Sequence, residues 1–234
     1  SSTRDQMQLH MDLLTHDIAN YTTPVMAYVE ALRGREGLPQ EVVQAIDRTY
    51  SQVDNIMFLV DTVRTLARLR ESGFLPQGRT DLRQVLAGAV SEAKSRSPGR
   101  SLEVSVQIPQ GPALVTADTM LKDAFMNLFA TAARSARRQE TRLVVTAEVK
   151  EEAGRDMWLV MVADPDRSIP DPLKTEVLTM SKKSRPELAG GFGIGLAAAK
   201  SIVERYGGKM WVSDIAPRDP SKGCVFNMLL PKAD

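Results

Sequence analysis

The stretch Leu13-Leu14-Thr15-His16-Asp17-Ile18-Ala19-Asn20 belongs to a heptad pattern that decides the first part of the fold. Apolar residues recur in alternating steps of four and three, at Met7, Met11, Leu14, Ile18, Tyr21, Val25, Tyr28 and Leu32. This spacing predicts a long helix with a single apolar seam. If Met11 occupies an a position, His16 falls at f, the position of the heptad that faces solvent most directly.

An imidazole on the exposed side of a helix can act as a nucleophile. Asp17 can accept a hydrogen bond from one ring nitrogen, and Asn20 lies one helical turn further along the same face as His16. His16, Asp17 and Asn20 therefore form a constellation that could move a phosphoryl group onto and off histidine. For His16 alone, a chance surface histidine is the simpler interpretation, and the hypothesis depends on motifs near the end of the chain.

The first two helices are predicted over residues 3–32 and 40–70, separated by the loop Gly34-Arg35-Glu36-Gly37-Leu38-Pro39. Two long helices joined by a short loop form an antiparallel hairpin. One hairpin cannot cover its own seam, so we expect a second copy to complete a four-helix bundle, which makes the chain a homodimer. Pro24 should bend the first helix, either as a tolerated kink or as a hinge for signalling.

Composition limits the function classes. The chain has 234 residues, 43% hydrophobic and 25% charged, with a formal net charge of +1. That charge gives no reason to expect nucleic acid or a membrane surface as a partner. Cys224 is the single cysteine, which suits a reducing compartment, and no apolar run reaches the ~20 residues that span a bilayer. We expect a cytoplasmic fragment of a longer sensor, soluble or membrane-anchored, since the first residue is serine.

The pattern changes after the hairpin. Residues 73–80 are predicted to be a linker between a first domain, residues 1–72, and a second domain, residues 81–234. In the second domain we expect helices at 82–93, 118–136, 173–180 and 196–206, and strands at 102–108, 113–116, 142–149, 157–163, 209–213 and 224–230. This order of elements predicts an α+β two-layer sandwich.

A glycine-rich run, Gly190-Gly191-Phe192-Gly193-Ile194-Gly195-Leu196, immediately precedes the last predicted helix. Glycines ahead of a helix N-terminus let backbone N–H groups approach phosphate oxygens. Lys182, Lys183 and Arg185 lie just upstream and could cover the phosphates of a nucleotide. No strand comes directly before the run and no Gly-Lys-Ser/Thr follows it, which excludes the dinucleotide fingerprint and the Walker loop.

Taken together, these motifs resemble the catalytic core of the two-component sensor histidine kinases, and of their archaeal members most closely. The stretch from His16 to Asn20 is similar to the H-box of that family. Asn127-Leu128-Phe129-Ala130-Thr131-Ala132-Ala133-Arg134 resembles the N-box, and Asp164-Pro165-Asp166-Arg167-Ser168-Ile169-Pro170 the first glycine box. Gly191 to Leu196 resembles the second glycine box. The order of four boxes is a more specific signal than any one of them.

The resemblance implies a dimerisation and phosphoacceptor hairpin followed by an ATP-binding domain of the Bergerat type. It implies that ATP phosphorylates His16 with help from Asp17, and that the phosphoryl group passes to an aspartate of a response regulator. Asn20 would position a water for the reverse, phosphatase reaction. ATP would be bound by Asn127, Asp164, Lys182, Lys183, Arg185, Gly191, Gly193, Gly195 and Leu196.

Three residues depart from the family pattern. Thr131 stands where the family has an asparagine that binds Mg²⁺, and a threonine hydroxyl is a shorter and weaker ligand. Asp166 and Ser168 replace the two glycines of the first glycine box, whereas Asp164, which the family uses to bind the adenine amino group, is present. Weak ATP binding, unusual metal dependence and loss of kinase activity are all open outcomes. The alternatives are a pseudokinase or phosphotransfer scaffold that docks a response regulator without using ATP, and a structural coiled-coil module.

Overall fold

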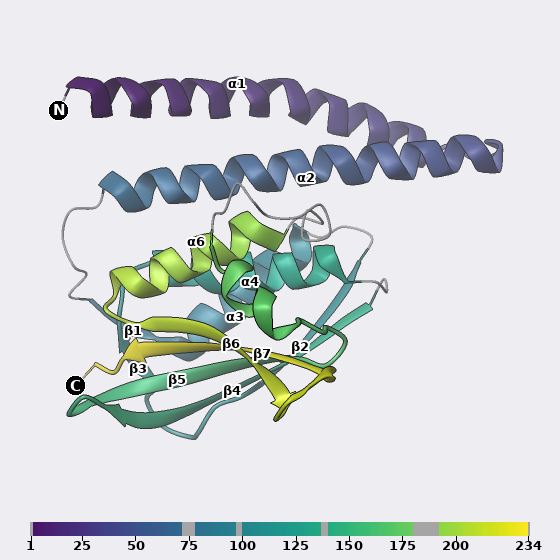
Figure 1. Ribbon diagram of the computed structural model, residues 1–234. Coiled ribbons are helices and arrows are strands. Elements are labelled where there is room, and N and C mark those ends of the chain that lie inside the picture. Colours follow the sequence, from purple (N-terminus) through teal and green to yellow (C-terminus); the bar gives the residue numbers. More distant parts are fainter. Residues whose placement is uncertain (1, 72–77, 97–99, 137–139, 180–191, 234) are drawn as a thin grey trace. The chain divides into compact units, whose positions relative to one another are not determined.

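The computed structural model describes the chain except for residues 1, 72–77, 97–99, 137–139, 180–191 and 234. The chain folds into two compact units, residues 1–71 and residues 72–234. The first unit is a helical hairpin and the second is a sheet with helices packed on it (Figure 1). Among the described helices, none has both the length and the apolar character that a membrane-spanning segment needs.

The hairpin consists of α1, Ser2–Arg33, and α2, Gln40–Glu71, which run antiparallel. Near the loop, Val29 of α1 is buried with Ile46 and Tyr50 of α2. Arg33 at the end of α1 pairs with Asp47, with 2.8 Å between Nε and Oδ1, and its guanidinium lies 4.7 Å from the centre of the Tyr50 ring. The closed end of the hairpin therefore has its own small core.

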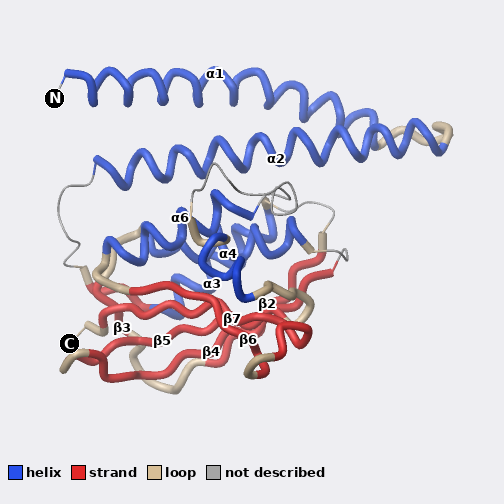
Figure 2. Tube along the Cα trace, in the orientation of Figure 1, coloured by secondary structure: helices blue, strands red, loops and turns tan. Residues whose placement is uncertain are grey.

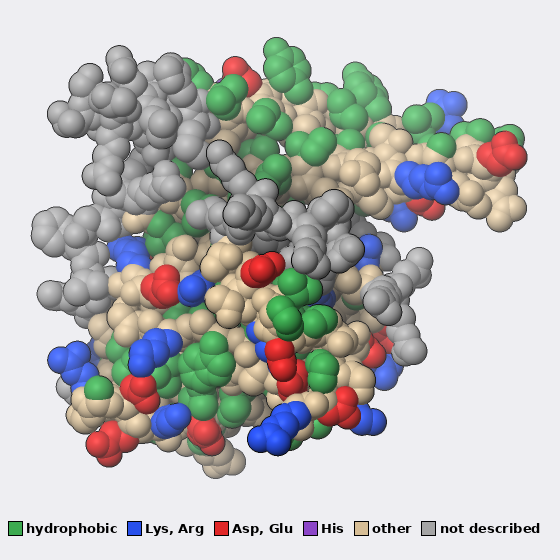
Figure 3. Space-filling model, viewed as in Figure 1, with side chains coloured by type: hydrophobic (Ala, Val, Ile, Leu, Met, Phe, Trp, Pro, Cys, Tyr) green, Lys and Arg blue, Asp and Glu red, His purple; other side chains and the backbone are tan. Residues whose placement is uncertain are grey.

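The predicted seam of α1 faces away from α2. Its six members with described side chains keep between 39% and 77% of their surface exposed, and these are Leu14, Ile18, Tyr21, Val25, Tyr28 and Leu32. Figure 3 shows apolar side chains gathered along the exposed surface of α1. The side chains of α1 that become buried are instead at e positions, such as Thr15 and Val29. A continuous apolar stripe is left uncovered within one copy of the chain.

Helix α1 continues through Pro24 and bends in its second half (Figure 1). Proline has no N–H and its ring crowds the carbonyl of the residue four positions earlier. In the turn before it, Thr22 Oγ1 donates to Ile18 O at 2.8 Å and Thr23 Oγ1 donates to Ala19 O at 2.8 Å. These hydroxyls add bonds to the carbonyls of the turn that follows His16, and threonines bonded in this way are common where helices bend.

The second unit contains a five-stranded sheet with the order β2-β4-β5-β7-β6 and a separate pair, β1 with β3. Only β2 and β4 are parallel; the other neighbours are antiparallel. The strands are β1 Arg79–Asp81, β2 Ser101–Gln107, β3 Leu114–Thr116, β4 Glu140–Glu152, β5 Arg155–Asp164, β6 Lys209–Ala216 and β7 Asp219–Pro231. The helices are α3 Leu82–Ser95, α4 Met120–Ser135, α5 Asp171–Glu176 and α6 Phe192–Arg205.

Helices α3, α4 and α6 lie on one face of the sheet (Figure 2), so the unit has the two predicted layers. Helix α4 lies between α3 and α6 and packs against both, and it is the most deeply buried of the helices. Its Phe125 and Phe129 are fully buried, with ring centres 6.1 Å apart. Asp118, just before α4, accepts a hydrogen bond from the Met120 N–H at 2.9 Å and another from the Tyr206 hydroxyl at 2.6 Å. These two bonds tie the start of α4 to the end of α6.

Three local predictions were wrong. The helix expected at 173–180 is α5, which begins at Asp171 and ends at Glu176. The segment predicted as a linker ends in strand β1, because Arg79 pairs with Thr116 across a distance in sequence that a three-residue pattern cannot reveal. Helix α6 begins at Phe192, so Gly193 and Gly195 lie inside its first turns and not ahead of the helix. Residues from Gly195 to Ala199 are buried, and packing stabilises this turn despite the low helix propensity of glycine.

Candidate functional site

The three predicted residues of the hairpin lie together on α1. His16 has 68% of its side chain exposed, and its Nδ1 lies 3.4 Å from Asp17 Oδ1 and 3.1 Å from Asn20 Nδ2. The first contact needs a proton on Nδ1, whereas the second needs a lone pair there, so a neutral ring makes only one of them at a time. When Nδ1–H faces Asp17, the lone pair belongs to Nε2. That nitrogen is then a nucleophile.

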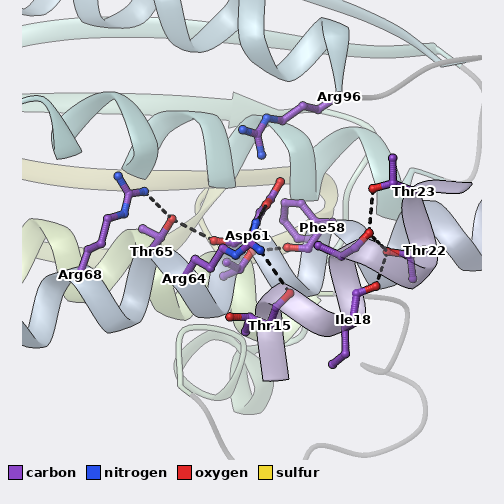
Figure 4. Close-up of polar contacts among 12 residues, drawn as sticks. Thr15, Ile18, Thr22, Thr23, Phe58, Asp61, Arg64, Thr65, Arg68 and Arg96 are labelled. Atoms are coloured by element: carbon purple, nitrogen blue, oxygen red, sulfur yellow. Dashed lines mark hydrogen bonds and ion pairs between the residues drawn. The ribbon is translucent and has the colours of Figure 1, made fainter. Parts of the chain in front are cut away.

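Helix α2 holds the turn that comes before His16. Arg64 Nη2 donates to the backbone carbonyl of Thr15 at 3.2 Å, and Arg64 Nη1 lies 3.7 Å from Asp61 on its own helix. Figure 4 shows the Arg64 side chain of α2 directed at the Thr15 carbonyl of α1. Sequence reasoning missed Arg64, because a contact across 49 positions has no local signal.

A second group of predicted residues lies on α4. Asn127 is fully buried, and its Nδ2 donates to Asp123 O at 2.9 Å, which fixes the orientation of the amide. Thr131 follows one turn later on the same side of the helix and is 1% exposed. Among the described residues, the Thr131 Oγ1 has no hydrogen-bond partner. A buried hydroxyl without a partner costs free energy, so this oxygen is a candidate to meet a ligand.

Strand β5 ends at Asp164, which is 2% exposed. Arg167 Nε donates to Asp164 Oδ2 at 2.6 Å, and Arg167 Nη2 donates to Ala132 O of α4 at 2.8 Å. The other carboxylate oxygen, Oδ1, accepts the Asp166 N–H at 3.3 Å. Arg167 therefore connects the end of β5 to α4 beside Thr131. Arg167 lies inside a motif recognised in the sequence, but no role was predicted for it. Its position between Asp166 and Ser168, which replace the two glycines, was the only indication that it could matter.

Strand β7 supports Asp164 from the neighbouring position in the sheet, where Cys224 is its partner. Burial raises the pKa of the Cys224 thiol to about 12, with a further contribution from the Asp164 charge. The thiol is therefore protonated and unreactive near neutral pH. Gly223, the preceding residue, has a φ of +107° and passes close to Asp164 O and the Pro165 backbone.

The remaining predicted residues belong to the glycine-rich segment. Gly195 and Leu196 are buried in α6, which packs against α4, and Gly193 lies on the helical backbone two residues before Gly195. The predicted contacts of Lys182, Lys183, Arg185 and Gly191 with phosphate lie outside the described residues.

The second unit matches a known protein family. Residues 116–234 match the model of the histidine kinase-, DNA gyrase B- and HSP90-like ATPases. This region contains α4, Asp164 and α6, so the family model covers every described residue assigned above to the nucleotide.

Two curated relatives and one solved structure cover most of the chain. The sensor protein FixL of Bradyrhizobium diazoefficiens is 30% identical over 206 residues, 83% of this chain and 36% of FixL. The probable sensor histidine kinase TcrY of Mycobacterium tuberculosis is 26% identical over 203 residues, 85% of this chain and 41% of TcrY. The structure of full-length ShkA in complex with AMPPNP has a TM-score of 0.59 at 17% identity, covering 96% of this chain and 46% of that chain. At that identity the likeness shows the fold alone.

The chain thus spans less than half the length of FixL or of TcrY. Both relatives are bacterial, and the expected similarity to archaeal members stays a prediction.

Proposed function

Because the chain belongs to the family of histidine kinase-, DNA gyrase B- and HSP90-like ATPases, we propose that it is the ATP-dependent core of a sensor histidine kinase. The proposal rests mainly on the position of His16. It is exposed on a helical hairpin, has an acid and an amide within reach, and belongs to the same chain as the ATPase fold. The matches to relatives named as sensor proteins are longer than the second unit, so they extend into the hairpin.

In the proposed reaction, His16 Nε2 attacks the γ-phosphorus of ATP in line with the leaving oxygen. The bond from the γ-phosphorus to the bridging oxygen breaks, ADP leaves with its electron pair, and the phosphoryl group stays on Nε2. The ring becomes positively charged, and Asp17 stabilises that charge through the Nδ1 proton. An aspartate of a response regulator then takes the phosphoryl group from His16. Asn20 orients a water for the phosphatase reaction.

We assign the nucleotide to the second unit. Asp164 would accept a hydrogen bond from the adenine amino group, and Asn127 and the start of α6 would face the phosphates. The unpartnered Thr131 Oγ1 fits Mg²⁺, because hard cations take oxygen ligands, and the ion would neutralise phosphate charge. Lys182, Lys183 and Arg185 remain proposed phosphate ligands. ATP and response regulators are found in the cytoplasm, so we propose that location for this chain.

The proposal is tested by incubating the purified chain with γ-labelled ATP and Mg²⁺. The wild-type chain should acquire label that is stable to base and lost in acid, as expected for phosphohistidine. The His16→Gln variant should acquire none, while the variant of the other histidine, His10→Gln, should be labelled like the wild type. No label on the wild type would contradict the kinase. A phosphotransfer scaffold would then be supported if His16 took label from a phosphorylated receiver domain.

We also propose that the exposed seam of α1 is covered by a second copy. A stripe of six apolar side chains along one helix is typical of a bundle interface, and a second hairpin would complete four helices. The four-helix bundle and the homodimer are therefore parts of the same proposal.

A lysine in the seam should weaken the dimer. In Val25→Lys, each copy would bring an unpaired ammonium to the interface, and we expect the dissociation constant of the dimer to rise at least about tenfold, because burying such a charge costs several kcal/mol. Light scattering after gel filtration, over a dilution series, measures the effect. Glu30→Lys, which changes charge at an exposed f position, is the control. Equal dimerisation of the two variants would show that the seam is not the interface.

A further inference from the structure

We infer that Arg167 competes with the nucleotide base for Asp164, so that its side chain sets the affinity of the site for ATP. The inference rests on the proposed function, which gives the Asp164 carboxylate to the adenine amino group. It adds to that function a residue of the chain, Arg167, that lowers the affinity for ATP.

The competition follows from the donors involved. The adenine amino group and the Arg167 guanidinium both offer N–H donors to a carboxylate. Arg167 Nε lies 2.6 Å from Asp164 Oδ2, a short charge-assisted contact, and the second oxygen already accepts the Asp166 N–H. Both carboxylate oxygens therefore already have a donor, and a base amino group makes its shortest bond to Asp164, at Oδ2, once the guanidinium has moved.

The guanidinium is held in place by more than the carboxylate. Its Nη2 donates to Ala132 O, one of the last four carbonyls of α4, which have no partner within the helix. A positive charge at the C-terminal end of a helix is also favoured by the helix dipole. The side chains of Arg167 and Asp164 are 7% and 3% exposed, so water does not screen the pair as it would at the surface.

These contacts divide the molecules into two populations. In one, Arg167 lies on Asp164 and the base binds weakly; in the other, the side chain is displaced and the base binds tightly. The apparent dissociation constant for ATP is then the intrinsic constant divided by the fraction displaced. Any event that moves the loop from Asp164 to Ser168 would raise that fraction and with it the affinity for ATP.

Calorimetric titration of the whole chain with ATP and Mg²⁺ tests the inference. Arg167→Gln removes the charge-assisted donor to Asp164, and the shorter glutamine side chain cannot span both Asp164 and Ala132. We expect ATP to bind this variant about 10- to 100-fold more tightly, since a competent minor state is commonly populated at about 1–10%. Arg155→Gln removes an exposed arginine from the far end of β5 and should bind ATP like the wild type.

A second readout covers the case in which Arg167→Gln folds poorly. A ligand that binds only the folded state raises the melting temperature, and the rise grows with the logarithm of the ligand concentration divided by the dissociation constant. The rise caused by the same excess of ATP should therefore be larger for Arg167→Gln than for the wild type. An equal or smaller rise, with unchanged or weaker binding, would overturn the competition and leave the kinase proposal intact. Absence of ATP binding by all three chains would overturn both.

Discussion

Substitution of Asp164 by alanine is expected to lower the free energy of unfolding by about 3–5 kcal/mol, the cost of breaking a buried ion pair by removing one partner. Arg167 would keep its charge in a site with 7% of its side chain exposed, and the Asp166 N–H would lose its acceptor. Urea denaturation followed by circular dichroism measures this loss. The same variant should bind no ATP, because the proposed acceptor for the base is gone.

The matched control is Asp156→Ala. Asp156 lies near the opposite end of the same strand and pairs with Lys232 at 2.8 Å, but the two side chains are 56% and 38% exposed. An exposed pair of this kind contributes about 1 kcal/mol or less, after allowing for solvent screening. Equal losses in the two variants would contradict the account of Asp164. The double variant Asp164→Ala/Arg167→Ala should recover part of the stability, since it leaves no unpaired charge in the site.

Substitution of Gly223 by alanine is expected to destabilise the same corner of the second unit by about 2–5 kcal/mol, the sum of left-handed backbone strain and overpacking. A Cβ on Gly223 would lie 2.6 Å from Asp164 O and 2.6 Å from Pro165 Cα. Both are backbone atoms, which cannot rotate aside as a side chain can. Strands β5 and β7 would therefore have to separate at the base site.

Gly111→Ala separates the two contributions. Gly111 has a φ of +103°, close to the +107° of Gly223, but a Cβ there would have no heavy atom within 4 Å. This control should lose only the strain, about 1–2 kcal/mol. Urea denaturation of both variants measures the difference, and losses of the same size would show that the close approach of Gly223 to Asp164 has no energetic consequence.

The elements that sequence could predict are those set by local periodicity. The alternating spacing of four and three residues predicted helix α1, and the f position predicted that His16 is exposed. Both features depend only on residues within a few turns of the helix. The strands of the sheet followed from alternation in the same way. The exposure of the apolar seam of α1 was also expected, because a single hairpin has no further helix that could cover it.

The features that sequence could not predict depend on partners far away in the chain. Strand β1 exists through its pairing with β3, and Arg64 reaches Thr15 across 49 positions. Arg167 lies within a motif that was recognised, yet its role depends on Ala132, 35 positions earlier. The missing glycines were the visible signal in the altered glycine box, whereas the contacts of the arginine between them appear only in the structure.

Autophosphorylation of His16 is tested by locating the phosphoryl group on the chain. The chain is incubated with ATP and Mg²⁺, kept at neutral to alkaline pH to preserve phosphohistidine, and fragmented for tandem mass spectrometry. We predict one phosphoryl group, on His16, which disappears when ATP is omitted. Phosphate on another residue, or none on His16 while calorimetry shows ATP bound, would contradict it.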